Sequence, residues 1–262
     1  MPVVPESIEV ISSELIEAEK RCRPLQPGVQ RYPYLDRATA YAVQLNTLEK
    51  RLMGGASVIG AKAAFTNRAV QAEYGVNEPV SGFLLDSGLR RDGAQVSFDE
   101  TIEARVEAEI AFVMARDLSG PGVSPALALH SVAGIMPALE VVDCRFVNWK
   151  VRAVDVAADS ACGSRVVLGA GLFPVSGIDL RLLGVVMEKN GQVVSTGAGA
   201  AALGNPIEVL AWLANNVGML GRSLMEGDVV ITGSLVRAEP VGRGDVFRAT
   251  FDRLGSVTVS FV

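Results

Sequence analysis

The first 56 residues contain two stretches of helical apolar spacing that are separated by a proline-rich break. The first stretch surrounds Ser12 and Ser13, whose hydroxyls can cap a helix. Prolines between positions 24 and 33 interrupt the pattern. A second helical stretch begins after Asp36, another capping residue, and ends at Gly54-Gly55. The pattern predicts a small, mainly helical N-terminal region over residues 1–56.

From position 57 onward the chain changes to short apolar segments punctuated by glycine and proline. The spacing predicts these elements: strands at 106–114, 138–143, 182–188, 192–196, 227–232, 246–251 and 256–262, and helices at 124–133 and 206–220. Asn190-Gly191 lies between two of the strands and predicts a hairpin, because both residues tolerate positive φ. We therefore predict an α+β fold in which the helical region packs on a strand-rich mixed β body over residues 57–262.

Charge and cysteine usage exclude several classes of protein. The chain has 24 basic and 29 acidic side chains, a net charge of -5, and no basic stripe, which disfavours nucleic acid and anionic membranes as partners. No segment reaches about 18 apolar residues, and the N-terminus has acid where a signal peptide has base. The cysteines are odd in number and far apart. We therefore expect no disulfide framework, and we expect a cytoplasmic location.

The single histidine, His130, limits the chemistry further. It excludes a histidine-rich zinc site, and its place in the predicted helix at 124–133 favours a structural role. The chain contains no G-x-S-x-G segment. We therefore set aside serine-hydrolase chemistry of that kind.

The strongest candidate for chemistry is a pair of glutamates in an apolar strand. Glu107 and Glu109 point to the same face because side chains alternate along a strand, and Glu140 interrupts a second apolar strand. Three carboxylates on two buried strands repel one another unless a hard cation compensates. They predict a Mg²⁺ or Mn²⁺ site with positions open to substrate and water. The alternative is a solvent-exposed face of an edge strand.

Three further side chains are candidates on weaker signals. Lys62 lies among small and apolar residues, where desolvation would lower its pKa and suit it to proton transfer. The alternative is an ordinary surface lysine. Ser234 follows a predicted strand and can place a hydroxyl in a pocket. Asp143 falls on the opposite face from Glu140 and is expected to cap a strand end or to pair with Arg145.

The chain resembles the hydratase/decarboxylase family of bacterial aromatic meta-cleavage pathways, within the fumarylacetoacetate hydrolase superfamily. The resemblance begins at Glu107-x-Glu109 with Glu140 and covers nearly the whole chain. Matching segments lie at 40–44, 105–113, 117–122, 137–145, 188–191, 195–204, 211–215 and 254–261. The resemblance implies a fold of the fumarylacetoacetate-hydrolase type, with the three glutamates as Mg²⁺ or Mn²⁺ ligands. It also implies that Lys62 is the active-site lysine of a G-x-K-x-G-x-T-S motif, here altered at two positions.

The chain departs from this family where the family's two activities differ. Hydratases have an acid in a P-D-x-G motif, but this chain has Val80 there, and decarboxylases also lack the acid. The family's A-D-N-A-S segment appears at 158–162 with two substitutions, and Arg165 falls where decarboxylases have arginine. The segment 232–235 is more similar to hydratases. The resemblance implies substrate contacts at Val80, Asp159, Ser160, Arg165 and Ser234.

The resemblance implies a metal-dependent lyase acting on a small unsaturated 2-oxo acid. Because the C-terminal half is more similar to hydratases, we expect hydration of 2-hydroxypenta-2,4-dienoate (2-keto-4-pentenoate) to 4-hydroxy-2-oxopentanoate. The alternative is decarboxylation of 2-oxo-3-hexenedioate (4-oxalocrotonate). Without an acid at position 80, hydration requires another acid, such as Asp86 or Asp159. The altered motifs leave a second alternative, a non-catalytic partner of an active homologue.

The family also implies the protein's partners. The family's hydratases and decarboxylases associate, so a complex with a homologous enzyme is possible, and the apolar C-terminal strands suggest a homo-oligomer. Hydrolysis of a carbon–carbon bond, as in the superfamily's acylpyruvate and fumarylacetoacetate hydrolases, is disfavoured because His130 lies outside any hydrolase-like motif.

Overall fold

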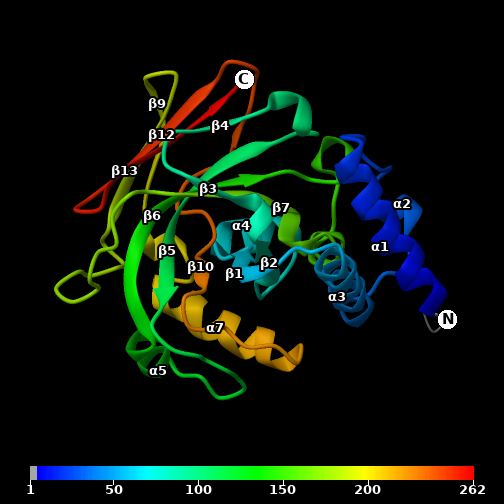
Figure 1. Ribbon diagram of the computed structural model, residues 1–262, viewed down its shortest axis with the longest axis horizontal. Helices are drawn as coiled ribbons and strands as arrows, with labels where there is room; N and C mark the ends of the chain where they lie inside the picture. The colour runs from blue at the N-terminus through cyan, green and yellow to red at the C-terminus, as the bar shows by residue number, and fades with distance from the viewer. Residues whose placement is uncertain (1–4) are drawn as a thin grey trace.

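The computed structural model describes residues 5–262, which form an α+β fold with two mixed β-sheets (Figure 1). The helices are α1 (Pro5–Lys20), α2 (Gly28–Arg31), α3 (Arg37–Met53), α4 (Arg68–Tyr74), α5 (Pro125–His130), α6 (Ala153–Ala158) and α7 (Pro206–Met219). The strands are β1 (Val58–Ala64), β2 (Val80–Leu85), β3 (Leu89–Arg91), β4 (Ala94–Val96), β5 (Arg105–Met114), β6 (Val132–Val142), β7 (Gly163–Leu168), β8 (Gly184–Lys189), β9 (Gln192–Ala198), β10 (Val229–Ile231), β11 (Glu239–Pro240), β12 (Val246–Phe251) and β13 (Gly255–Phe261).

The N-terminal helices α1 and α3 lie side by side at one end of the molecule, away from the C-terminal strands (Figure 1). Asp36 caps α3 as predicted, because its carboxylate accepts a hydrogen bond from the Thr39 backbone N–H at 2.8 Å. Ile11 and Leu15 of α1 pack in one apolar cluster with Val43 of α3. The same cluster also contains residues of α6 and of β2. The N-terminal helices therefore pack against the end of the larger sheet that lies beside the candidate residues.

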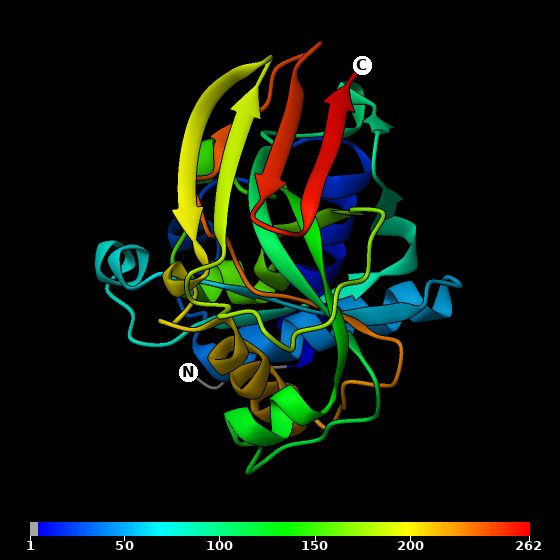
Figure 2. The same cartoon turned by 90° about the vertical axis from the view of Figure 1, so that its left-hand side faces the viewer.

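The larger sheet has eight strands in the order β2-β1-β10-β5-β6-β7-β3, with β11 paired to β5. The β1–β10 and β3–β7 pairs are parallel and the other pairs are antiparallel. The second sheet has five strands in the order β4-β13-β12-β8-β9. In Figure 2 its C-terminal and hairpin strands stand at the top of the molecule, and α5 and α7 lie at the bottom.

The main apolar core lies between the two sheets. Val106, Ala108 and Ile110 of β5 point into it, together with Phe247 and Phe261 of the second sheet. Because side chains alternate along a strand, the intervening residues of β5 point to the opposite face of the larger sheet. That opposite face carries the candidate chemistry, since Glu107 and Glu109 occupy the intervening positions.

Most predicted elements are confirmed, and their ends differ by a few residues. Asn190 and Gly191 both have positive φ, at 54° and 76°, and join β8 to β9 as a hairpin. The helix predicted at 124–133 is wrong at its end, because α5 stops at His130 and Val132 already begins β6. The strand predicted at 138–143 is correspondingly longer, because β6 pairs with β5 along most of its length. In residues 5–262 no helix has the length and apolar character needed to cross a membrane.

Candidate metal centre and active site

Three glutamates converge on the face of the larger sheet that is turned away from the main core. Glu107 and Glu109 alternate along β5, and the register of the β5–β6 pair places Glu140 directly opposite Glu107. Each residue offers one carboxylate oxygen, and these oxygens all lie within 4.8 Å of one another. The structure therefore brings the three predicted acids together.

Several oxygens of this group are buried without a partner. Glu109 and Glu140 are 0% and 1% exposed. Glu109 Oε2 accepts a hydrogen bond from the Gly233 backbone N–H at 2.7 Å. Within residues 5–262, however, Glu109 Oε1 and Glu140 Oε2 have no hydrogen-bond partner. Buried, unsatisfied carboxylate oxygens are costly, so the donor set fits a hard divalent cation such as Mg²⁺ or Mn²⁺.

The electrostatics of the group point in the same direction. Burial, followed by repulsion from Glu140, raises the pKa of Glu107 to about 7, against opposing attraction from Lys62 and Arg105. Burial and the same repulsion raise the pKa of Glu109 well above its ordinary value. Without added positive charge, the cluster therefore holds protons at neutral pH. A divalent cation would displace these protons on binding.

Lys62 lies on β1, on the same face as the glutamates, and is only 1% exposed. Its Nζ lies 2.8 Å from Glu140 Oε1 as an ion pair and donates a hydrogen bond to the Ala161 carbonyl at 2.7 Å. The surface-lysine alternative is therefore wrong. The predicted lowering of its pKa is also wrong: burial does act to lower the pKa, but the negative charges of Glu140, Glu107 and Glu109 outweigh it and raise the pKa.

A left-handed turn after α6 positions the carbonyl that Lys62 contacts. Ser160, Ala161 and Cys162 have consecutive φ angles of 47°, 55° and 54°. The left-handed conformation costs roughly 1–2 kcal/mol for each non-glycine residue. The turn packs against Gly82 of β2, where a Cβ would lie 2.3 Å from the Ser160 carbonyl oxygen. The close approach therefore requires glycine at position 82, and it directs the Ala161 carbonyl toward Lys62.

A cavity of about 800 Å³ lies beside the cluster. Lys62 and Glu107 form part of its wall, together with Ser234, as predicted for that serine. Two arginines that sequence reasoning missed, Arg105 and Arg237, also line it. A signal for Arg105 was present, because it precedes Glu107 by two residues and strand alternation places both on one face. No comparable signal was available for Arg237, which lies in a loop.

The other four predicted substrate contacts lie elsewhere. Val80 is buried in the apolar cluster with the N-terminal helices. Ser160 uses its hydroxyl to accept a hydrogen bond from the Phe83 backbone N–H at 3.1 Å. Asp159, Ser160 and Arg165 border a different pocket, beside α1 and α3. Arg165 belongs to the face of the sheet opposite Glu140, because its register partner is Val141. The structure thus does not bring these four side chains to the cavity with Lys62.

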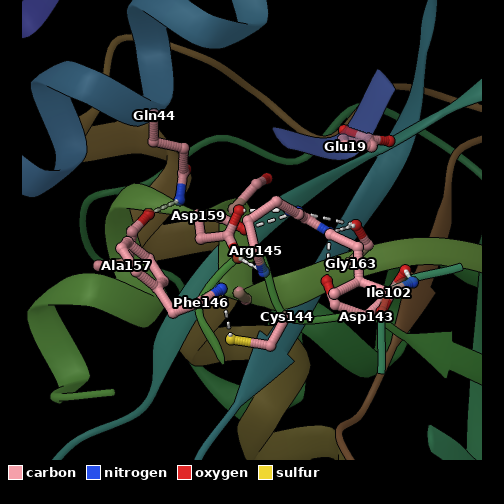
Figure 3. A network of polar contacts seen from close by, with 12 residues as sticks. Glu19, Gln44, Ile102, Asp143, Cys144, Arg145, Phe146, Ala157, Asp159 and Gly163 are labelled. Carbon is pink, nitrogen blue, oxygen red and sulfur yellow. Dashed lines mark hydrogen bonds and ion pairs between the residues drawn. The ribbon is translucent and has the colours of Figure 1, made fainter. Parts of the chain in front are cut away.

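Asp159 belongs to a buried polar network around Arg145 (Figure 3). Its carboxylate accepts hydrogen bonds from the Arg145 guanidinium and from the Arg145 backbone N–H, the latter at 3.1 Å. The predicted ion pair between Asp143 and Arg145 is therefore wrong. Asp143 instead accepts hydrogen bonds from the backbone N–H groups of Ile102 and Glu103, both at 2.8 Å. Asp143 follows directly after the end of β6, and its carboxylate caps the backbone of the segment before β5. This capping is the other role that the sequence predicted for it.

A second group of potential ligand atoms fits a cation poorly. One atom each of Cys144, Asp159 and Cys162 lies within 4.8 Å of the others. The Arg145 guanidinium is ion-paired to Asp159 and would repel a cation at this position. A hydrogen bond with the Cys144 thiol, together with burial, raises the pKa of Cys162 well above its ordinary value. The Cys162 thiol therefore remains protonated, and the three glutamates are the better metal site.

The raised pKa values predict how pH and metal act together on stability. Between about pH 4.5 and 7 the folded, metal-free protein binds more protons at Glu107 and Glu109 than the unfolded chain does. Through these two groups, the free energy of unfolding of the metal-free protein is highest below the pKa of the unfolded carboxyls. It falls as the pH rises through their raised pKa values in the folded protein. We expect Mg²⁺ to raise the Tm more at about pH 8 than at about pH 5.5, because protons no longer compete. Thermal melts with and without Mg²⁺ at both pH values test this, and an equal or larger rise at the lower pH would contradict it.

Comparison with known proteins places the chain among enzymes of one family. Residues 57–262 match the model described as "Fumarylacetoacetate (FAA) hydrolase C-terminal". A 2-hydroxypent-2,4-dienoate hydratase from Pseudomonas putida is 40% identical over 82% of this chain and 97% of its own length. A 4-oxalocrotonate decarboxylase from Pseudomonas putida is 35% identical over 98% of this chain and 97% of its own.

A solved structure resembles the whole fold. It is the 4-oxalocrotonate decarboxylase from Pseudomonas putida G7, complexed with magnesium and adipate. It is 34% identical to this chain and superposes with a TM-score of 0.96 over 99% of both chains. The similarity therefore includes the N-terminal helices as well as both sheets.

Proposed function

Because this chain belongs to the fumarylacetoacetate hydrolase family, and within it to the meta-cleavage hydratases and 4-oxalocrotonate decarboxylases, we propose that its reaction is the decarboxylation of 2-oxo-3-hexenedioate. The coarser activity, that of a metal-dependent lyase, is common to these relatives. One observation favours decarboxylation over hydration. Apart from the glutamates assigned to the metal, the only carboxylate that lines the cavity among the described residues is the exposed Glu73.

Hydration requires a group that holds and activates water, and the obvious substitutes for an acid at position 80 are engaged elsewhere. Asp86 accepts hydrogen bonds from the backbone N–H groups of Ser57 and Ser87, at 3.0 and 2.8 Å. Asp159 is held by Arg145 in the buried network. Neither carboxylate lines the cavity. Loss of CO₂ needs no such base, so the residues present suit that reaction.

Glu107, Glu109 and Glu140 would hold the divalent cation. When bound, the cation supplies Lewis-acid stabilisation of negative charge that develops on the 2-oxo group. Small and apolar residues, including Ala161 and Val142, also form part of the cavity wall.

Lys62 is the proton donor in this proposal. Breaking the bond to the departing CO₂ leaves an electron pair that moves through the conjugated chain to the 2-oxygen. A proton from Lys62 Nζ then completes 2-hydroxypenta-2,4-dienoate, so the charges and atoms balance. The ammonium form is the one that Glu140 and the Ala161 carbonyl hold in place, through contacts of 2.8 and 2.7 Å. The raised pKa of Lys62 keeps that form populated before the reaction.

Hydration of 2-hydroxypenta-2,4-dienoate is the second candidate. Hydratases and decarboxylases are both similar to this chain over nearly their whole length, so identity alone does not separate the two reactions. In this case Glu73 or the Tyr74 hydroxyl, both of which line the cavity, would have to position the water.

The test is to incubate the purified protein and Mg²⁺ separately with 2-oxo-3-hexenedioate and with 2-hydroxypenta-2,4-dienoate. Ultraviolet absorbance and CO₂ release are followed, with EDTA as the control for metal dependence. We expect EDTA-sensitive CO₂ release from the first substrate and little consumption of the second. Conversion of the second substrate to 4-hydroxy-2-oxopentanoate without CO₂ release from the first would replace decarboxylation by hydration. Metal binding without turnover of either would favour a non-catalytic partner of an active homologue.

A further inference from the structure

One charged group on the cavity wall has no role in the steps described so far. Arg105 begins β5, two residues before Glu107, and lines the same cavity as Glu107 and Lys62. It lies close enough to Glu107 to lower the pKa of that carboxyl. Two residues of strand span roughly 7 Å. Arg105 therefore lines the same cavity, but its position on β5 is farther along the strand than the three glutamates.

Arg105 is held in place by an aromatic ring and not by an acid. Its Cζ lies 4.5 Å from the centroid of the Trp149 ring, and the Trp149 indole N–H is fixed by a hydrogen bond to the Glu103 carbonyl at 2.9 Å. Within residues 5–262, no ion pair or hydrogen bond engages the Arg105 guanidinium. A half-buried guanidinium stacked on a ring and free along its edge is well suited to bind a carboxylate with two hydrogen bonds.

The charge balance of the cavity supports an anionic ligand at this point. Three ionised glutamates and the Lys62 ammonium leave two negative charges, which a divalent cation neutralises. Arg105 and Arg237 then leave two positive charges on the cavity wall, against the one negative charge of the exposed Glu73. A 2-oxo acid with a single carboxylate would leave the Arg105 end of the cavity without a partner, whereas a second carboxylate at the far end of the ligand would satisfy it.

We propose that Arg105, supported by Trp149, binds the second carboxylate of a dicarboxylic 2-oxo acid and thereby selects dicarboxylic over monocarboxylic substrates. This inference rests on the proposed function, since it assumes that the 2-oxo acid end of the ligand lies beside Lys62 and the glutamates. Arg237 lines the mouth of the same cavity but is exposed, so it contributes less. Exposed charges are screened by solvent and salt.

The experiment measures binding, so that it does not depend on turnover. Two unreactive ligands of equal chain length, 2-oxoadipate and 2-oxohexanoate, differ only in the second carboxylate. Their Kd values are measured by calorimetry on the Mg²⁺-loaded protein. For the variant Arg105→Met we expect the affinity for 2-oxoadipate to fall about 10- to 100-fold, the range of a hydrogen-bonded charge pair. The affinity for 2-oxohexanoate is expected to change by less than about threefold.

Two further variants sharpen the result. Arg105→Lys keeps the charge without the planar fork and is expected to recover part of the affinity for 2-oxoadipate. Arg248→Met, at an exposed position of β12, is the matched control and is expected to leave both Kd values unchanged. Equal losses for both ligands in Arg105→Met would overturn the inference, because Arg105 would then serve the metal site or the fold. Unchanged binding of 2-oxoadipate would overturn it as well.

This outcome is separable from the proposed reaction. Selective loss of 2-oxoadipate binding in a protein that releases no CO₂ from 2-oxo-3-hexenedioate would support the Arg105 site and reject the decarboxylation. Turnover of that substrate with no selective effect of Arg105→Met would do the reverse.

Discussion

Replacing Glu109 with glutamine is expected to lower metal-dependent turnover by about a thousandfold or more. Glutamine keeps the size of the side chain and an oxygen to accept the Gly233 backbone N–H, which lies 2.7 Å from Glu109 Oε2. It removes one of the three negative charges that compensate a divalent cation. Stabilisation of the reacting charge by a bound metal amounts to several kcal/mol, and about 1.4 kcal/mol corresponds to a tenfold change in rate.

The same substitution is not expected to destabilise the metal-free protein. Glu109 has a pKa well above its ordinary value because it is buried and faces Glu140, so a neutral amide relieves repulsion at neutral pH. The Tm without metal is therefore expected to stay unchanged or to rise, while calorimetry shows weakened Mg²⁺ binding. Glu208→Gln, at an exposed position of α7, is the matched control. Full Mg²⁺-dependent activity in Glu109→Gln would rule out the assignment of this carboxylate to the metal.

Replacing Lys62 with methionine is expected to lower turnover about 100- to 10,000-fold, the range for loss of a positioned proton donor. Methionine has a similar length but carries no charge and donates no proton. The substitution removes the ammonium that contacts Glu140 and the Ala161 carbonyl.

Binding measurements separate the role of Lys62 from a defect in the metal site. Loss of the ammonium leaves more uncompensated negative charge near the glutamates, so Mg²⁺ affinity is expected to be retained or increased in Lys62→Met. Lys150→Met, at an exposed position after β6, controls for the loss of a positive charge. If Lys62→Met kept wild-type kcat with intact Mg²⁺ binding, another group would have to donate the proton.

The local parts of this site were predictable from sequence because they depend on short-range geometry. Strand alternation is a property of the backbone, so Glu107 and Glu109 had to share a face once β5 was recognised. The hairpin at Asn190-Gly191 and the cap at Asp36 also follow from the preferences of single residues. These features lie within a few residues of the signal that predicts them.

The parts that depend on long-range pairing were not predictable in the same way. Glu140 faces Glu107 only through the register of β5 with β6, and Lys62 is buried because β1 pairs with β10, far away in sequence. The direction of the Lys62 pKa was mistaken for this reason, since local sequence indicates burial but not the three carboxylates that face the ammonium. Arg165 likewise lies on the far face of the sheet because of the register of β7 with β6.

The central claim is that the three glutamates together hold one divalent cation beside Lys62. The most direct test is the anomalous diffraction of a crystal soaked in Mn²⁺, a cation that suits carboxylate ligands. The account predicts one strong anomalous peak in contact with the carboxylates of Glu107, Glu109 and Glu140, which weakens in a crystal of Glu109→Gln. A peak at Cys144, Asp159 and Cys162 instead, or no peak at the glutamates at saturating Mn²⁺, would contradict it.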